Sequence, residues 1–117
     1  MVGYNLGNVE SIFADIIWAN EPLSTFELVK ICNEKLNWKR STTYTVLKRL
    51  CEGGLFKMEN STVSALISRD DFYSAKSEQF VKESFNGSLP KFIAAFTKCQ
   101  KLSKDEIDEI RAMIDAE

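Results

Sequence analysis

The clearest pattern of hydrophobic and polar positions lies in residues 38–54 and predicts an amphipathic helix that ends at a glycine pair. Its inward side chains recur at i, i+3, i+4 and i+7, the spacing of one buried helical face. These positions are Thr43, Val46, Leu47 and Leu50. Gly53 and Gly54 follow, and glycine readily takes the left-handed conformation that ends many helices.

The other sides of this helix are rich in hydroxyl and cationic groups. Hydroxyls bond to base edges or phosphates, and Lys and Arg neutralise phosphates. The outward side chains are Ser41, Thr42, Tyr44, Thr45, Lys48 and Arg49. The pattern fits a DNA-recognition helix, and it also fits an ordinary amphipathic helix with a solvated polar face. Either Lys39 or Ser41 could be its N-terminal cap.

Two further helices are predicted before this one. The first spans about Asn8 to Ala19. The second begins at Ser24, because Glu27 three residues later completes a capping box, and it ends near residues 37–38. The inward side chains expected for the first helix are Val9, Ile12, Phe13, Ile16 and Ile17, with Trp18 near its end. Two consecutive helices with a short turn, the second basic outside, are typical of a helix-turn-helix.

A short β-hairpin is predicted next. Residues 55–59 and 62–67 have the pattern of two short strands, and Asn60 and Ser61 between them supply a polar turn. Three helices followed by a hairpin is the element order of a winged helix. Such a hairpin usually lies against the phosphate backbone, and Lys57 is its one cation.

Residues 69–117 read as helices only. Ser68, Ser88 and Ser103 supply N-terminal caps, and the helices that follow are rich in Phe and Ile. Three short helices cannot hide that many apolar groups alone, so we expect a partner chain to cover them. The alternative is that they fold back on their own winged helix.

Together these patterns predict a mainly α fold with a small β-hairpin. A winged helix-turn-helix DNA-binding domain would occupy residues 1–68, and a helical dimerisation region would occupy residues 69–117.

Charge is unevenly distributed along the chain. The net charge is −2, but residues 30–60 carry seven bases against three acids, whereas residues 1–29 carry four acids and no base. A local basic patch on an acidic protein suits a DNA-binding face.

Several classes of function receive no support from the composition. The chain has no histidine, the commonest general base and metal ligand, and no Gly-rich phosphate loop. We therefore expect no enzyme, no metal site and no cofactor. Cys32, Cys51 and Cys99 are odd in number and widely spaced, which indicates small buried hydrophobes rather than disulfides. Without a long apolar run or a signal segment, a cytoplasmic protein is expected.

The order and spacing of several segments resemble a known family. They are Ile16, Ile17 and Trp18, then Trp38 with residues 42–50, then residues 89–96 and 102–111. The chain resembles the BlaI/MecI/CopY family of bacterial transcriptional repressors, the penicillinase-repressor family. The resemblance implies an N-terminal winged helix that binds operator DNA and a C-terminal helical region that forms a homodimer.

Three departures bear on what this chain recognises. The third helix often opens Ser-Pro-Lys-Thr in the family, whereas the matching residues here are Lys39, Arg40, Ser41 and Thr42. Tyr44 replaces a frequent arginine. The cysteine pairs of the copper-sensing branch are absent.

In the penicillinase branch a regulatory protease cuts between asparagine and phenylalanine, and the matching bond here is Ala95-Phe96.

The site residues expected from this reading fall into three groups. Base contacts are expected from Ser41, Thr42, Tyr44 and Thr45, and phosphate contacts from Lys39, Arg40, Lys48, Arg49 and Lys57. The expected dimer contacts are Phe72, Phe80, Phe85, Phe92, Phe96, Ile107, Ile110 and Ile114. A two-fold dimer requires an inverted-repeat operator. The alternative function is a winged-helix protein-interaction module that does not bind DNA.

Overall fold

The computed structural model describes residues 5–117. The chain forms two compact units, Met1–Ser77 and Glu78–Glu117, which divide inside the helix α4 (Arg69–Ser84).

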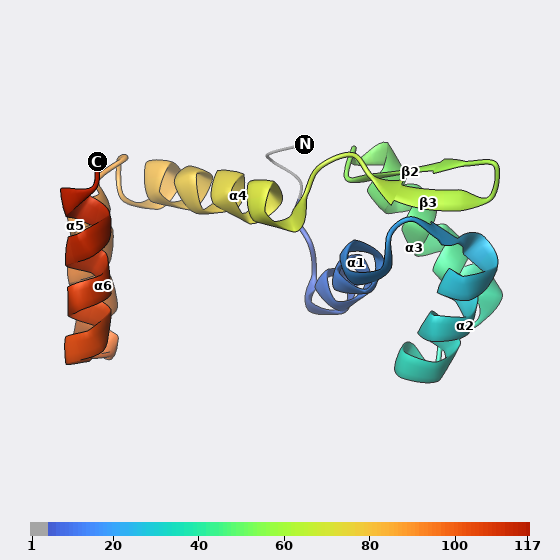
Figure 1. Cartoon of the computed structure of the whole chain (residues 1–117), viewed down its shortest axis with the longest axis horizontal. Helices are drawn as coiled ribbons and strands as arrows, with labels where there is room; N and C mark the ends of the chain where they lie inside the picture. The colour runs from blue at the N-terminus through green and yellow to red at the C-terminus, as the bar shows by residue number, and fades with distance from the viewer. Residues whose placement is uncertain (1–4) are drawn as a thin grey trace. The chain divides into compact units, whose positions relative to one another are not determined.

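The first unit begins with three helices, α1 (Asn8–Asn20), α2 (Thr25–Leu36) and α3 (Arg40–Glu52) (Figure 1). Ser24 caps α2, since its hydroxyl accepts the Glu27 N–H at 3.1 Å. Asn37 ends α2 in the left-handed conformation, with φ of 55°, which asparagine tolerates. The short turn to α3 makes the pair a helix-turn-helix, as the sequence predicts.

Three short antiparallel strands complete the first unit. β2 (Phe56–Glu59) and β3 (Thr62–Ala65) form the predicted hairpin, and β1 (Leu23–Ser24) adds a third strand in the order β1-β3-β2. At the hairpin turn Asn60 and Ser61 have φ of 53° and 60°. Two consecutive left-handed residues make the turn whose twist matches the strands.

The hairpin is attached to the helix-turn-helix at both ends. The Thr25 N–H at the start of α2 donates to the Ser61 carbonyl at 2.9 Å, and Glu21 Oε1 accepts the Ala65 N–H at 2.8 Å. β1 pairs with β3 through Leu23 opposite Val63. These bonds fix the position of the wing relative to α2.

The core of the first unit is built from one face of each helix and the inner face of the sheet. All four inward positions predicted for α3 are buried, and Leu50 is fully inaccessible. The buried hydrophobic residues are Phe13, Ala14, Ile16, Ile17, Leu23, Leu28, Cys32, Val46, Leu47, Leu50, Leu55, Phe56, Val63 and Phe72. This core fixes which sides of α2 and α3 face outward.

The beginning of α4 is tied to α1 within the first unit. Trp18 lies against Phe56, Phe72 and Tyr73, with ring centroids 5.3, 5.7 and 6.1 Å away, and its indole N–H donates to the Ile67 carbonyl at 2.9 Å. Arg69 bonds to Asp15 at 2.8 Å. The first turns of α4 therefore extend the winged-helix core.

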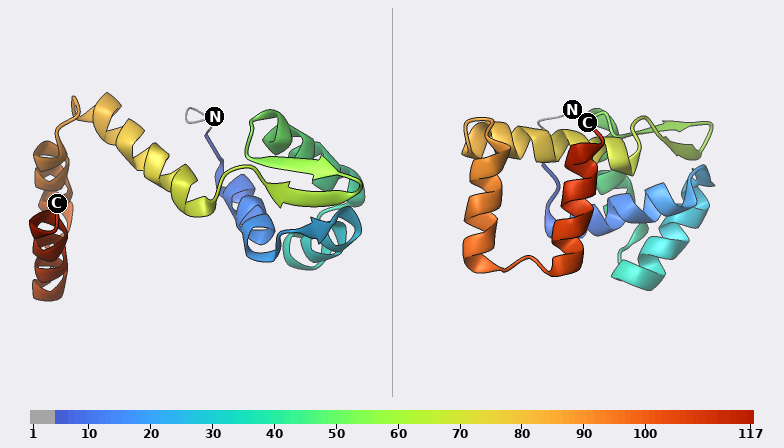
Figure 2. Two further views of the ribbon diagram at one scale, coloured as in Figure 1. Left: turned by 45° about the horizontal axis from the view of Figure 1, so that its top comes forward. Right: turned by 60° about the vertical axis from the view of Figure 1, so that its left-hand side comes forward.

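The second unit contains the end of α4, α5 (Leu89–Cys99) and α6 (Lys104–Asp115). Figures 1 and 2 show α5 and α6 running in opposite directions. Ser88 and Ser103 cap them as predicted, accepting the N–H groups of Lys91 and Glu106 at 3.2 and 3.1 Å. No residue of this unit is buried.

The fold class predicted from the sequence is confirmed, with four corrections. The sheet has three strands rather than two. Only Gly54, with φ of 85°, is left-handed after α3, whereas Gly53 is not. Val9 and Ile12 are about half exposed, because the core side of α1 centres on Phe13 and Ile17.

The fourth correction concerns Cys99, which is exposed at the end of α5, whereas Cys32 is buried as predicted and Cys51 is half-buried.

Among residues 5–117, no helix has both the length and the apolar character needed to cross a membrane.

Phe72 tests the packing of α4 on the winged helix. Replacing this 2%-exposed ring by alanine leaves a cavity beside Trp18, so Phe72→Ala should lower the free energy of unfolding by about 3–5 kcal/mol. Denaturant titration measures the change. Phe26→Ala, at a 77%-exposed ring in the same unit, is the control and should change stability little. Equal stabilities for the two variants would contradict the packing described for α4.

Candidate nucleic-acid interface

The outward face of α3 presents the residues that the sequence assigns to base contacts. Ser41, Thr42 and Thr45 are exposed, and Tyr44 is half-buried. The Thr45 hydroxyl donates to the Ser41 carbonyl at 2.9 Å, so its oxygen can still accept a hydrogen bond. All four predicted base-contacting residues thus lie on α3 outside its buried stripe, and three of them are exposed.

The first turn of α3 is cationic. Lys39 is the N-terminal cap residue, and its side chain makes no capping hydrogen bond, so the alternative of Ser41 as the cap is excluded. The Arg40 guanidinium lies over the Tyr44 ring, 5.4 Å from its centroid. This cation–π contact holds a positive charge at the edge of the hydroxyl-rich face.

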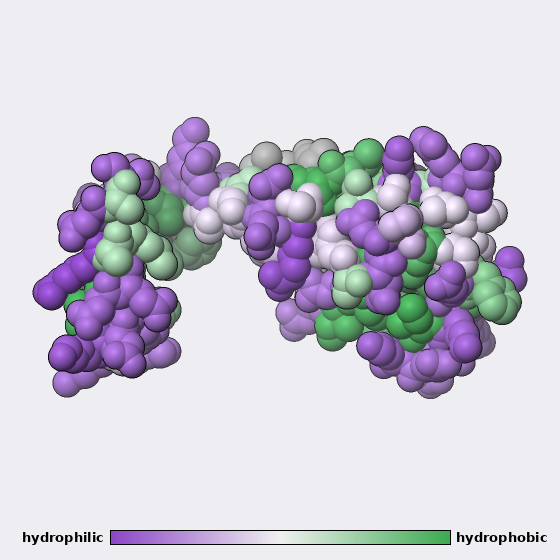
Figure 3. Space-filling view, viewed as in Figure 1, coloured by the Kyte–Doolittle hydropathy of each residue, from purple (hydrophilic) through white to green (hydrophobic). Residues whose placement is uncertain are grey.

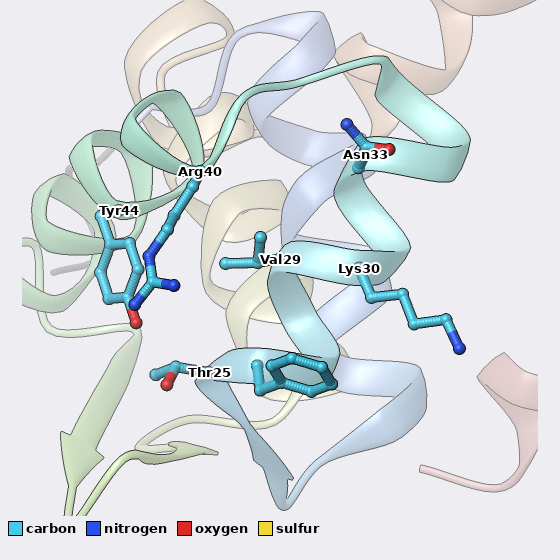
Figure 4. Close-up of a pocket in the computed structure, with 7 residues that line it drawn as sticks. Thr25, Val29, Lys30, Asn33, Arg40 and Tyr44 are labelled. Atoms are coloured by element: carbon cyan, nitrogen blue, oxygen red, sulfur yellow. The ribbon is translucent and has the colours of Figure 1, made fainter.

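Two grooves flank α3, and Tyr44 lines both. One, about 390 Å³, lies between α2 and α3, and the Arg40 and Tyr44 side chains extend from α3 toward α2 in Figure 4. The other, about 360 Å³, lies between α3 and β2 and includes Lys48 and Met58. α3 therefore has an open groove on each side.

Arg49 does not lie free at the surface. Its guanidinium donates to Glu10 Oε2 at 2.7 Å, and Glu10 Oε1 accepts the Gly7 N–H at 3.1 Å. The bond from the Gly7 backbone, together with the Arg49 hydrogen bond and charge, lowers the pKa of Glu10 below its usual value despite partial desolvation. The Arg49 side chain remains 56% exposed, so an additional anion can approach it.

The cations on the rest of this face differ in their pairing. Lys57 on β2 lies 3.7 Å from the Glu59 carboxylate on the same strand. Lys39 and Lys48 are exposed and form no ion pair within residues 5–117. Lys57 near the wing and Arg49 on α3 are therefore partly compensated by carboxylates, whereas Lys39 and Lys48 are not.

The apolar residues of the second unit form an aromatic cluster. Phe85 contacts Phe80 and Phe92 at ring-centroid distances of 5.9 and 5.6 Å, and Phe96 continues the row 6.3 Å from Phe92. Phe80 and Phe96 are 52% and 43% exposed. In Figure 3 the visible face of the α5 and α6 pair is largely hydrophilic, as expected for amphipathic helices.

The other residues of the expected dimer contact divide between the units. The sequence pattern assigns Phe72 to this contact, but its ring lies in the core of the first unit against Trp18, so it is not available to a partner. On α6, Ile107 and Ile110 are half-buried and Ile114 is exposed.

The bond matched to the cleavage site of the family lies inside a helix. Ala95 and Phe96 both belong to α5, and the Phe96 carbonyl accepts the Gln100 N–H at 3.1 Å. The expectation that Phe96 packs beside Phe92 agrees with their ring contact.

Burial raises the pKa of the Cys32 thiol to about 11, and it also raises the pKa of Cys51. A raised pKa keeps a thiol protonated and unreactive near neutral pH. These two cysteines therefore act as packing residues.

Sequence reasoning missed three residues around this face. Glu10 pairs with Arg49 across the fold, and no local pattern reveals such a pairing. Phe26 and Lys30 line the groove between α2 and α3. The sequence pattern could have identified both as surface residues, because they lie off the buried side of α2 that Leu28 and Cys32 mark.

Glu10 gives this site a pH-dependent stability. Its pKa is lowered in the folded state, so its stabilisation is complete above the unfolded value and is lost as pH falls below 4.5. Glu10→Gln should lower the free energy of unfolding at pH 7 by up to about 1 kcal/mol, and the difference should shrink toward pH 3.

Denaturant titrations at both pH values measure it, with Glu59→Gln, at a more exposed and longer ion pair, as the control. A difference of the same size at pH 3 and pH 7 would contradict the role of the carboxylate.

The chain is similar to known proteins over nearly its full length. A family model described as penicillinase repressor matches residues 6–116. The methicillin resistance regulatory protein MecI of Staphylococcus aureus (strain Mu50 / ATCC 700699) is 24% identical over 115 residues, covering 95% of this chain and 94% of MecI.

A penicillinase repressor of Bacillus licheniformis is 25% identical over 104 residues, covering 86% of this chain and 81% of that protein. MecI of Mammaliicoccus sciuri is 24% identical over 115 residues, with 95% of this chain and 94% of that protein covered. The relatives are distant, but the family model spans the winged helix and the C-terminal helices alike. The chain belongs to the penicillinase repressor family.

Proposed function

We propose that this protein is a transcriptional repressor that binds operator DNA in a sequence-specific manner as a homodimer. The observation that carries the proposal is the outward face of α3, whose hydroxyl and cationic groups are accessible on a helix-turn-helix. Membership of the penicillinase repressor family and relatives named as regulators and repressors support it.

In this proposal α3 enters the major groove. Ser41, Thr42, Tyr44 and Thr45 approach base edges, where hydroxyl groups bond to either donors or acceptors. Lys39, Arg40, Lys48, Arg49 and Lys57 approach phosphates. Arg49 would share its charge between a phosphate and Glu10, so its contribution to affinity should be smaller than that of Lys48.

The homodimer rests on a separate observation. Forty residues without one buried side chain cannot form a stable unit alone, because burial of apolar surface must offset the ordering of the chain. A second copy would cover Phe80, Phe85, Phe92, Phe96 and the isoleucines of α6. A two-fold axis would then place two α3 helices on one face of an inverted repeat, roughly 10 bp or a multiple apart.

The experiment that tests the proposal is a gel shift on DNA upstream of the gene, followed by selection of bound genomic fragments. Salt-dependent binding to a selected fragment carrying an inverted repeat is the expected result. Absence of binding to any duplex would instead favour a protein-interaction module, for which the acidic net charge of −2 is the motivating observation.

Variants of α3 should separate positioning contacts from base contacts. Lys48→Gln should weaken binding to all duplexes and reduce the slope of log affinity against log salt by about one. Thr42→Val removes one hydroxyl at constant shape and should reduce the operator preference by about 1–3 kcal/mol, or about 5- to 150-fold.

Fluorescence anisotropy at several salt concentrations measures both effects. Lys98→Gln, an exposed lysine on α5, is the control and should keep the slope of the unsubstituted protein. An unchanged slope for Lys48→Gln and an unchanged preference for Thr42→Val would refute these contacts.

Truncation tests the dimer and the effect of cutting the chain at the family cleavage position. A protein ending at Ala95 lacks Phe96 and all of α6, so it should be mainly monomeric and should fail to repress. Each isoleucine buried in an interface is worth about 1.5–3 kcal/mol, and α6 carries three of them.

Sedimentation at micromolar concentration and a reporter assay measure both consequences. A protein ending at Asp115, which keeps all of α6, is the control and should remain dimeric. Dimers or full repression from the protein ending at Ala95 would show that these helices do not control activity. A regulatory protease that cuts at this bond would end repression by removing these dimer contacts.

A further inference from the structure

Phe26 is the most exposed large hydrophobic side chain in the described part of the protein. It lies in the first turn of α2, and 77% of its surface is accessible. The core side of α2 is supplied by Thr25, Leu28 and Cys32, so Phe26 contributes nothing to the core. The ring is therefore accessible to another molecule, and its neighbours decide what it could bind.

The ring belongs to the groove between α2 and α3. The groove is lined by Thr25, Phe26, Val29, Lys30, Asn33, Arg40 and Tyr44, and no carboxylate is among them. In Figure 4 the Val29 side chain on α2 points toward Arg40 and Tyr44 on α3. The groove thus combines apolar side chains, hydrogen-bonding groups and the cationic Arg40, whereas the Lys30 side chain points away from Arg40 in Figure 4.

This chemistry matches one step of a nucleic-acid backbone. A sugar offers an apolar face, and the adjoining phosphate needs a cation or an N–H donor. Arg40 is already oriented by its contact with the Tyr44 ring at 5.4 Å. Charge complementarity therefore favours an anion with an apolar neighbour over an uncharged ligand.

The position of the groove selects the backbone rather than a base. In a helix-turn-helix the second helix enters the major groove, and the helix before it crosses the phosphate backbone. Phe26 lies on that preceding helix, whereas the predicted base contacts lie on α3.

We propose that the groove between α2 and α3 seats one sugar–phosphate step of the DNA strand that borders the major groove. Phe26 covers the deoxyribose, and Arg40 binds the adjoining phosphate. The inference rests on the proposed function, and it adds to that function a contact that strengthens binding without reading sequence.

Phe26→Ala tests the contact. The variant should bind both the operator and an unrelated duplex about tenfold more weakly, because part of the stabilisation from burying a phenylalanine is lost. Its salt slope should not change, because no charge is removed. Arg40→Gln should instead reduce the salt slope by about one. Anisotropy titrations at several salt concentrations measure both.

Matched controls separate this contact from general effects. Leu66→Ala removes another exposed apolar side chain, which lines neither groove, and should bind as the unsubstituted protein does. Thermal unfolding of Phe26→Ala should match that of the unsubstituted protein. An operator with deoxyuridine in place of thymine tests base reading, because only the thymine methyl is removed.

Three results would overturn the inference. Unchanged affinity of Phe26→Ala would show that Phe26 does not make this contact, while leaving the proposed function intact. A loss confined to the operator, or one that disappears on deoxyuridine DNA, would make Phe26 a base contact. Failure of the unsubstituted protein to bind any duplex would contradict the proposed function and this inference together.

Discussion

The arrangement of the first unit depends on the burial of one side of α3. Thr43, Val46, Leu47 and Leu50 pack into a core shared with α1 and the sheet, and this packing fixes the rotation of the helix about its axis. Hydroxyl and cationic groups at the intervening positions must then face outward. A rotation of α3 would bury Lys48 or Arg49 and expose leucine, which is strongly unfavourable. The same stripe therefore stabilises the fold and orients the proposed DNA-binding face.

The surroundings of α3 refine that face. The wing is tied to the start of α2 by the Thr25 to Ser61 hydrogen bond, so the hairpin and the helix-turn-helix present one surface. Glu10 restrains Arg49, whereas Lys48 lies free of ion pairs in the described chain. Cations of equal formal charge are thus unequal in their availability to phosphate.

The second unit follows a different constraint. Its helices are capped locally by Ser88 and Ser103, so each helix is well specified by its own sequence. Their apolar residues are nevertheless at most half-buried within the unit. Local hydrogen bonding forms these helices, and we propose that association with a second copy completes their packing.

Sequence reasoning succeeded where the signal is local and periodic. The stripe of α3, the serine caps and the Asn60-Ser61 turn all follow from spacing or from side-chain chemistry within a few residues. It failed where distant segments meet. β1 is only two residues long and exists because Leu23 pairs with Val63, and Phe72 lies in the core because its ring packs against Trp18. The pairing of Arg49 with Glu10 joins residues 39 positions apart.

The central claim is that the outward face of α3 contacts DNA. Nuclear magnetic resonance of the isotope-labelled protein, titrated with a duplex selected from genomic fragments, tests it most directly. The account predicts that the largest changes in amide signals fall on residues 39–49 and on the wing, while amides on the buried side of α1 change little. Changes confined to α5 and α6, or none on α3 at saturating DNA, would contradict it.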